Sequence, residues 1–234
     1  MEGGDLALAE RAPFLASIRD RTARYQPTHS PTSVWTHGRP PDAGRAAAVG
    51  DLSARFLEEL EALGGHGRRV EDLAAAREAV LALARERGAE RLVRWDDDEL
   101  ERLGVDGPLR EQGIEVAVWR DLADFRKAAG EAGIGLTGAD WAVAETGSIL
   151  LAGGQGRGRS AALLPPVHIA VVPVERIVAT LEEAVAHYAQ AGEVPSSLAF
   201  HTGPSRSGDI EMTLTVGVHG PGDVHVLLVA PPHR

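Results

Sequence analysis

The feature that most restricts the fold of this chain is the alternation of short apolar segments with amphipathic segments after residue 90. Apolar runs rich in β-branched residues predict strands at 91–95, 114–119, 142–145, 148–152, 168–172, 197–201 and 224–229. Apolar residues three or four positions apart predict helices at 51–63, 71–88, 121–131, 175–190 and 208–216. Strands that alternate with helices are typical of a parallel sheet covered by helices on both faces. We therefore expect an α/β fold with three layers, αβα, and a mostly parallel sheet.

The turn Thr146-Gly147 separates the strands predicted at 142–145 and 148–152. A two-residue turn that contains glycine favours a hairpin, so we expect part of the sheet to be antiparallel.

The first 50 residues differ from the rest of the chain. Apolar residues at helical spacing predict a helix over 6–25, and a proline-rich stretch over 27–45 has few large apolar side chains. We expect an N-terminal helical arm at 1–50, which could mediate packing or a homo-oligomer, followed by an α/β domain at 51–234.

Composition excludes several classes of function. A net charge of −10 argues against nucleic acid as a partner, because phosphates would be repelled. No segment approaches the roughly 20 apolar residues that span a bilayer, so we expect no membrane insertion, and the absence of cysteine fits a cytoplasmic location. The chain has no cysteine and therefore cannot ligate an iron–sulfur cluster through thiolates of its own. Lys127 is its only lysine, which argues against Schiff-base chemistry.

Candidate functional residues gather in three glycine-bounded segments, 137–148, 203–211 and 217–221, which we call the three polar segments. Such turns at strand ends let backbone N–H groups, carboxylates and an imidazole converge on one small ligand. We predict that Glu145, Asp209 and His219 are catalytic. The predicted substrate-binding residues are Thr137, Asp140, Thr146, Gly147, Ser148, His168, Gly203, Ser205, Arg206, Ser207, Glu211 and Gly220.

Each of these patterns also has a purely structural explanation. Ser205 or Ser207 could cap a helix over 208–216 that ends at Gly217, and Glu145 could be an exposed turn residue. If Glu145 points inward instead, it could act as an acid, a base or a nucleophile. His168 and His219 could join Asp209 and Glu211 at a metal, but no two of the histidines have helical ligand spacing, and we expect no metal site.

The glycine-rich run 153–160 almost matches a phosphate-binding loop, with Arg159 in place of the required lysine. The prolines at 165 and 166 leave little room for the helix that such a loop must open into. We interpret the run as a surface loop.

Together and in this order, these segments resemble the lactate-utilization (LUD) domain family, and specifically its stand-alone C-type subunit. The matching residues are Thr137-Gly-Ala-Asp140, Ala144-Glu-Thr-Gly-Ser148, Leu164-Pro-Pro-Val-His-Ile169, Gly203-Pro-Ser-Arg-Ser-Gly-Asp-Ile-Glu211 and Gly217-Val-His-Gly-Pro221. The resemblance implies a fold like that of the glucosamine-phosphate isomerase, ribose-phosphate isomerase and CoA-transferase group (the NagB/RpiA/CoA-transferase-like fold). It also implies a role in the oxidation of L-lactate to pyruvate, beside partner subunits that carry the iron–sulfur clusters.

Three functions are compatible with the sequence. In the first, the chain is a subunit of a lactate-oxidising system, Arg206 holds a small carboxylate by two hydrogen bonds, and Glu145 or His219 moves a proton. In the second, it is an isomerase, acyl or CoA transferase, or cyclo-ligase that acts on an anionic metabolite. In the third, it is a non-catalytic assembly or regulatory module.

Overall fold

The computed structural model describes residue 16 and residues 51–122, 124–191, 195–208 and 214–231. Contacts divide the chain into two units, residues 1–46 and 47–234, and all described residues except residue 16 belong to the second unit. The predicted N-terminal arm lies outside the described residues apart from residue 16, so the boundary at residue 50 stays a prediction.

A six-stranded parallel sheet forms the centre of the second unit, as the sequence predicted. In spatial order its strands are β1 (His66–Val70), β12 (Asp223–Val229), β7 (Val167–Pro173), β4 (Ile134–Thr137), β2 (Arg91–Arg94) and β3 (Glu115–Val118). Every neighbouring pair is parallel. The inner strand β4 is buried throughout, and β7 is buried up to Pro173, as expected where both faces of a sheet are covered.

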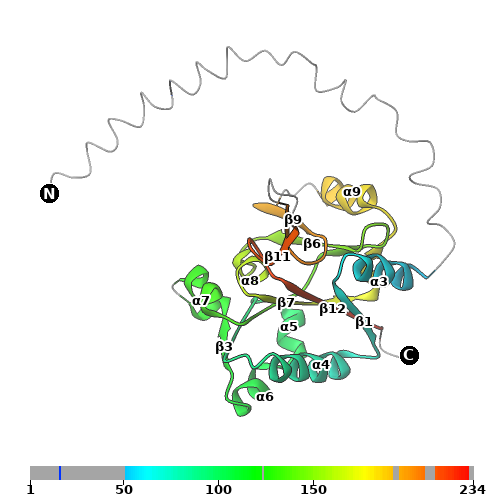
Figure 1. The fold of residues 1–234 in the computed structure, drawn as a ribbon. Coiled ribbons are helices and arrows are strands. Elements are labelled where there is room, and N and C mark those ends of the chain that lie inside the picture. The colour runs from blue at the N-terminus through cyan, green and yellow to red at the C-terminus, as the bar shows by residue number, and fades with distance from the viewer. Residues whose placement is uncertain (1–15, 17–50, 123, 192–194, 209–213, 232–234) are drawn as a thin grey trace. The chain divides into compact units, whose positions relative to one another are not determined.

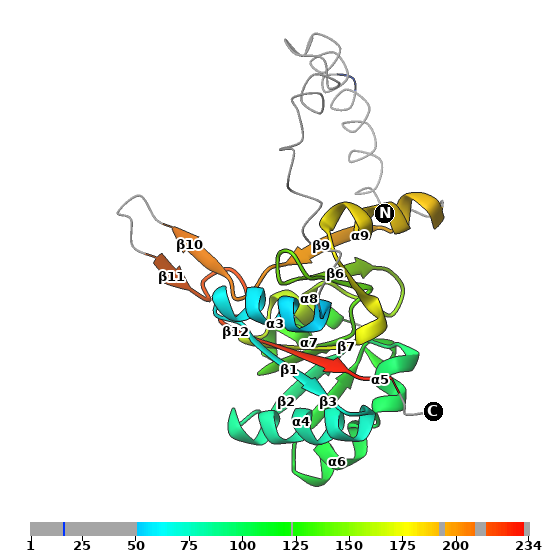
Figure 2. The same cartoon turned by 90° about the vertical axis from the view of Figure 1, so that its right-hand side faces the viewer.

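Helices cover both faces of this sheet (Figures 1 and 2). On one side lies α4 (Leu73–Glu86), with α5 (Asp98–Leu103) packed beside it. On the other side lie α3 (Leu52–Ala62) and α8 (Ser160–Leu163), and α7 (Phe125–Glu131) packs against α8. A short helix, α6 (Asp106–Glu111), and a 3-10 turn, η1 (Trp119–Asp121), flank β3. This arrangement confirms the α/β class.

Aspartates fix where four of these helices begin. Each side chain accepts a hydrogen bond from a backbone N–H of the first turn, which would otherwise have no partner within the helix. The capping residues are Asp51 for α3, Asp72 for α4, Asp97 for α5 and Asp124 for α7. In the described part of the chain, no helix is both long and apolar enough to cross a lipid bilayer.

A second, smaller sheet contains the predicted hairpin. Its order is β8 (Ile177–Val178), β5 (Trp141–Val143), β6 (Ser148–Gly153) and β9 (Ser197–His201). Strands β5 and β6 are antiparallel, as predicted, although they form a separate sheet rather than part of the main one. The strand predicted at 197–201 is also correct, but β9 pairs antiparallel with β6 and is not in the parallel sheet.

The helix predicted over 208–216 is wrong. The chain instead forms antiparallel strands β10 (Arg206–Gly208) and β11 (Leu214–Val216), which Figure 2 shows beside α3. The residues Leu214-Thr-Val216 favour a strand, and Gly217, at a φ of 80°, follows β11 in a turn instead of ending a helix.

The helix predicted over 175–190 begins later than expected. A 3-10 turn, η2 (Val174–Arg176), and strand β8 come first, and α9 (Leu181–Ala191) then starts after Thr180. The Thr180 hydroxyl accepts from the Glu183 N–H at 3.2 Å and caps this helix.

Candidate functional site

The three polar segments lie next to one another in the structure. The Ser148 and Thr202 hydroxyl oxygens are 2.8 Å apart, which joins the first segment to the residue that precedes the second. The Ser205 N–H donates to the Pro221 carbonyl, and the Gly217 N–H donates to the Ser205 carbonyl, each at 2.9 Å. Segments that are far apart in the sequence therefore meet where the two sheets approach α3.

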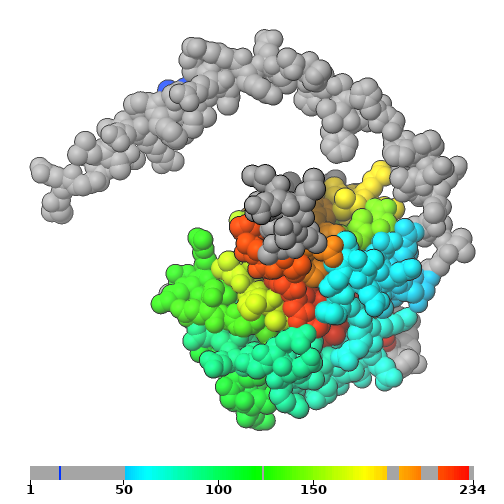
Figure 3. All heavy atoms as spheres, viewed as in Figure 1, coloured from blue at the N-terminus to red at the C-terminus, as the bar shows by residue number. Residues whose placement is uncertain are grey.

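Arg206 attaches this region to the end of α3. Its guanidinium donates to the backbone carbonyl of Leu63, the residue that caps α3. In Figure 3 the orange and red C-terminal segments lie against the cyan residues of α3 and β1. Arg206 is exposed, so the other guanidinium N–H groups have access to solvent.

Hydroxyl groups form a short hydrogen-bonded chain at this junction. The Thr146 hydroxyl donates to the Ser148 hydroxyl at 2.8 Å, and Ser148 in turn contacts Thr202. Ser148 is buried, so these hydrogen bonds replace those that water would supply. Two of these three residues belong to the predicted substrate-binding set.

A pair of imidazoles, His168 fully buried and His201 half-buried, links the two sheets. His168 on β7 is fully buried, and its Nε2 lies 2.9 Å from the Thr137 hydroxyl at the end of β4. The His201 ring on β9 meets the His168 ring edge-on, with centroids 5.5 Å apart. Burial holds the pKa of His168 well below its usual value and lowers the pKa of His201 to about 4. Both rings are thus neutral at pH 7, and the Nδ1 of His168 has no protein partner.

Two predicted carboxylates are held in hydrogen bonds of the fold. Asp140 accepts from the Ala152 N–H at 2.7 Å and from the Arg157 guanidinium at 2.9 Å. Glu145 is half-buried and accepts from the Leu181 N–H at 2.7 Å, at the first residue of α9. Glu145 thus helps Thr180 to satisfy the N–H groups at the start of α9.

The predicted glycines occupy close contacts. Gly147 has a φ of 62°, and a Cβ there would lie 2.5 Å from the Leu60 backbone nitrogen in α3. Gly203, with a φ of 71°, lies against Leu63, and Gly220 lies against Ser205. Gly147 and Gly203 therefore require glycine for packing and backbone conformation, whether or not a ligand binds nearby.

The other predicted residues are less clustered in the described structure. His219 is exposed, and the backbone of Ser207 pairs with Thr215 between β10 and β11. Asp209 and Glu211 lie outside the described residues. Among the residues that the structure describes, no three His, Asp or Glu side chains are arranged to hold a metal ion.

His201 is a residue of this region that our sequence reasoning missed. It is the last residue of β9 and directly precedes Thr202-Gly203, where the second polar segment begins. Its position directly before a glycine turn was the sequence signal that could have marked His201 as a candidate. Without its pairing to β6, however, the sequence could not bring it to His168.

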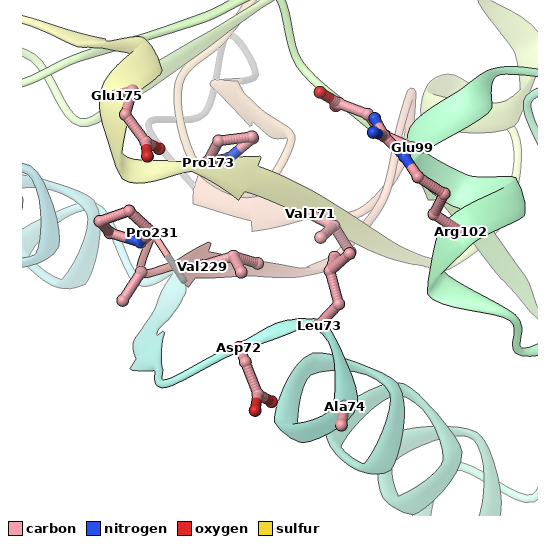
Figure 4. A pocket seen from close by; sticks show the side chains of 11 residues that line it. Asp72, Leu73, Ala74, Glu99, Arg102, Val171, Pro173, Glu175, Val229 and Pro231 are labelled. Atoms are coloured by element: carbon pink, nitrogen blue, oxygen red, sulfur yellow. The ribbon is translucent and has the colours of Figure 1, made fainter. Parts of the chain in front are cut away.

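A cavity of about 470 Å³ opens elsewhere, at the carboxyl edge of the parallel sheet (Figure 4). The ends of β7 and β12, the first turn of α4 and one side of α5 surround it. Open α/β sheets commonly bind ligands at this edge. The residues that line this cavity are Asp72, Leu73, Ala74, Glu99, Arg102, Val171, Pro173, Glu175, Val229, Ala230 and Pro231.

A parallel sheet with helices on both faces, in contact with a smaller mixed sheet through the rings of His168 and His201, places the chain among the α/β proteins. The chain belongs to the LUD domain family, because the sequence profile of that domain matches residues 53–229. The family resemblance noted in the sequence is therefore confirmed.

Similar proteins are found over nearly the whole chain. Lactate utilization protein C from Geobacillus sp. (strain WCH70) is 32% identical over 226 residues, which cover 90% of this chain and 92% of that protein. Lactate utilization protein C from Anoxybacillus flavithermus is 31% identical over 209 residues, 89% of this chain and 94% of that protein.

A solved structure supports the fold. The crystal structure of a DUF162 family protein from Deinococcus radiodurans matches with a TM-score of 0.55 and 24% identity, and covers 77% of this chain and 99% of that chain. The likeness to the isomerase and CoA-transferase group stays a prediction.

Proposed function

We propose that this chain is a component of L-lactate utilization, the oxidation of L-lactate to pyruvate, and that it works in the cytoplasm. The observation that carries this proposal is the similarity to Lactate utilization protein C, at 32% identity across 90% of the chain. The LUD domain match over residues 53–229 includes all three polar segments and both sheets, so the similarity concerns the whole α/β domain and not one shared motif.

Electron transfer in this proposal takes place in partner subunits that hold iron–sulfur clusters. The chain has no cysteine and offers no thiolate for such a cluster. Its own contribution is to bind a small anionic metabolite or to position the partners. The predicted N-terminal arm is a candidate surface for contacts between copies of the chain.

The proposed metabolite site is built from the three polar segments. Support comes from the hydrogen bonds that join these segments and from Arg206, whose exposed guanidinium can pair with a carboxylate. In this proposal Glu145, Asp209 or His219 moves a proton at the hydroxyl carbon of the metabolite. The neutral rings of His168 and His201 would supply a hydrogen-bonding environment without a fixed charge.

Growth on L-lactate tests the function directly. Deletion of the gene in its source organism should stop growth on L-lactate and leave growth on pyruvate intact, because only the oxidation step is lost. Reintroduction of the wild-type chain should restore growth. Normal growth of the deletion strain on L-lactate, with no second copy of the gene present, would contradict the proposal.

A further inference from the structure

The cavity at the carboxyl edge of the parallel sheet differs in chemistry from the proposed metabolite site. Its floor is apolar and formed by the buried side chains of Val171 and Val229, with Pro173 beside them. Leu73, at the start of α4, is 37% exposed and lies at this cavity. Figure 4 shows these four side chains in the middle of the cavity. Such a surface favours an apolar body on any ligand.

Carboxylates outnumber cations around this apolar floor. Among the residues that the structure describes, Asp72, Glu99 and Glu175 line the cavity, and Arg102 is the one basic lining residue. In Figure 4 Glu175 lies on one side of the cavity, and Glu99 and Arg102 lie on the opposite side. The described lining residues therefore carry a net negative charge, which would repel a carboxylate ligand.

Among these three acids, Glu99 forms an ion pair with Arg176. Its Oε1 lies 2.5 Å from the Arg176 guanidinium, which also donates to the Ala139 carbonyl at 2.7 Å. Burial raises the pKa of Glu99 even though Arg176 opposes this shift, and the negative charge of Asp97 raises it further. Arg102 and Arg157 also favour the charged form of Glu99, yet its pKa stays raised against all three arginines, so a further cation nearby would be favourable.

The N-terminus of α4 does not reverse this preference. The positive end of a helix dipole attracts anions. Here Asp72 already provides the anion, because its carboxylate accepts from the Ala75 N–H at 2.8 Å. A ligand that approaches this turn meets the Asp72 carboxylate as well as the helix dipole.

We propose that the carboxyl-edge cavity binds a small molecule that has an apolar body and one positively charged end, such as an amine, and that it discriminates against carboxylates. The apolar body lies on Val171, Val229 and Leu73, and the charged end lies near Glu99 or Glu175. Lactate and pyruvate are carboxylates, so this cavity is separate from the metabolite site proposed above.

Three probes of similar shape test the charge preference. These are 2-phenylethylamine, 2-phenylethanol and 3-phenylpropanoate, which share a phenyl ring and a short chain and are positive, neutral and negative at pH 7. Each is titrated into the full-length ¹⁵N-labelled chain, and amide shifts are followed. We expect the amine to move the amide signals of Leu73, Ala74 and Val229 and to bind about tenfold more tightly than the carboxylate.

Variants assign that preference to the lining acids. Glu99→Gln and Glu175→Gln should each weaken binding of the amine about threefold or more. Glu175 is exposed, so its variant tests the charge argument even if loss of the Arg176 ion pair makes Glu99→Gln less stable. Glu111→Gln on α6 removes the same charge far from the lining residues and should leave binding unchanged.

Two results would overturn the proposal. One is that the carboxylate binds as tightly as the amine. The other is that the amine leaves the amides of the cavity unmoved while the protein is folded.

Discussion

Gly135 determines how closely α8 can approach β4. A Cβ at this position would lie 1.7 Å from the Ala161 carbonyl oxygen, a backbone atom that can move only with its helix. We expect Gly135→Ala to lower the free energy of unfolding by about 3 kcal/mol, because the substitution overpacks the interface. Urea unfolding followed by circular dichroism measures the change.

Gly130 provides a matched control on α7. A Cβ there would meet nothing within 4 Å, and the position is helical. Gly130→Ala should therefore stabilise the protein, by up to about 1 kcal/mol, through helix propensity. If Gly135→Ala were as stable as Gly130→Ala, the inference that α8 packs closely against β4 at Gly135 would be wrong.

Glu145 can be tested for function separately from its capping role. Glutamine keeps an oxygen that can accept from the Leu181 N–H but loses the negative charge. We expect Glu145→Gln to unfold within about 1 kcal/mol of the wild type and to fail to support growth on L-lactate. Unfolding measurements and complementation of the deletion strain check the two parts.

The nearby Glu183 is the control for this substitution. Its carboxylate accepts from the Ala179 N–H at 3.0 Å, so it also stabilises the start of α9. Glu183→Gln should retain growth on L-lactate, because Glu183 is not part of the proposed site. Full growth from Glu145→Gln as well would leave Glu145 with a capping role alone.

At the scale of whole elements, Arg94 connects β2 to α5 and α6. The side chain is buried and donates to both carboxylate oxygens of Asp106 at 2.7 Å and to Glu101 at 2.8 Å. Burial opposes its charge, yet the hydrogen bonds to these two acids raise the pKa of Arg94. Asp106→Ala should cost about 2–3 kcal/mol of the free energy of unfolding, because it leaves a buried guanidinium partly unpaired.

A double variant distinguishes this explanation from a simple loss of packing. Arg94→Met removes the charge, so Asp106→Ala should cost much less in that background than in the wild type. A double-mutant cycle measured in urea gives the coupling. Equal costs in both backgrounds would show that Asp106 does not act through Arg94.

The elements that the sequence predicted best are those with a clear apolar pattern. Strands β7 and β12 were predicted to within one residue at each end, because their apolar runs are continuous. Strand β1 was missed because four of its five residues are exposed and two are arginines, as an edge strand permits. The helix at 208–216 was predicted from a short apolar spacing and from capping residues, and such residues also occur in turns between strands.

The candidate site was predictable only in part, for a similar reason. The glycine turns could be predicted from the local sequence, and the three segments that contain them do contact one another in the structure. The carboxyl-edge cavity could not be read from the sequence. Its lining residues come from α4, α5, η2 and two strands that are distant in the sequence, and the strand order alone brings them together.

At the scale of the whole domain, the two sheets are joined across a pair of uncharged imidazoles, and this makes acid stability a test of the fold. The pKa of His201 is about 4 in the folded chain, below its value of about 6.5 in an unfolded chain. Between these values the unfolded state binds more protons than the folded state, so stability falls as the pH falls. The stabilisation that depends on a neutral His201 is fully present above about pH 6.5. Its complete loss, below a pH of about 4, lowers the free energy of unfolding by about 3 kcal/mol.

His201→Phe keeps an aromatic edge against His168 and removes one of the titrating groups. Between pH 7.5 and 5 the wild type should lose about 2 kcal/mol of its free energy of unfolding through His201. The variant lacks this group, so its free energy of unfolding should fall by about 2 kcal/mol less over the same range. Urea titrations at several pH values measure both curves. His219→Gln, at an exposed position, should follow the wild type. If His201→Phe also followed the wild type, His201 would be accessible to protons in the native state, and the two sheets would not be packed closely around it.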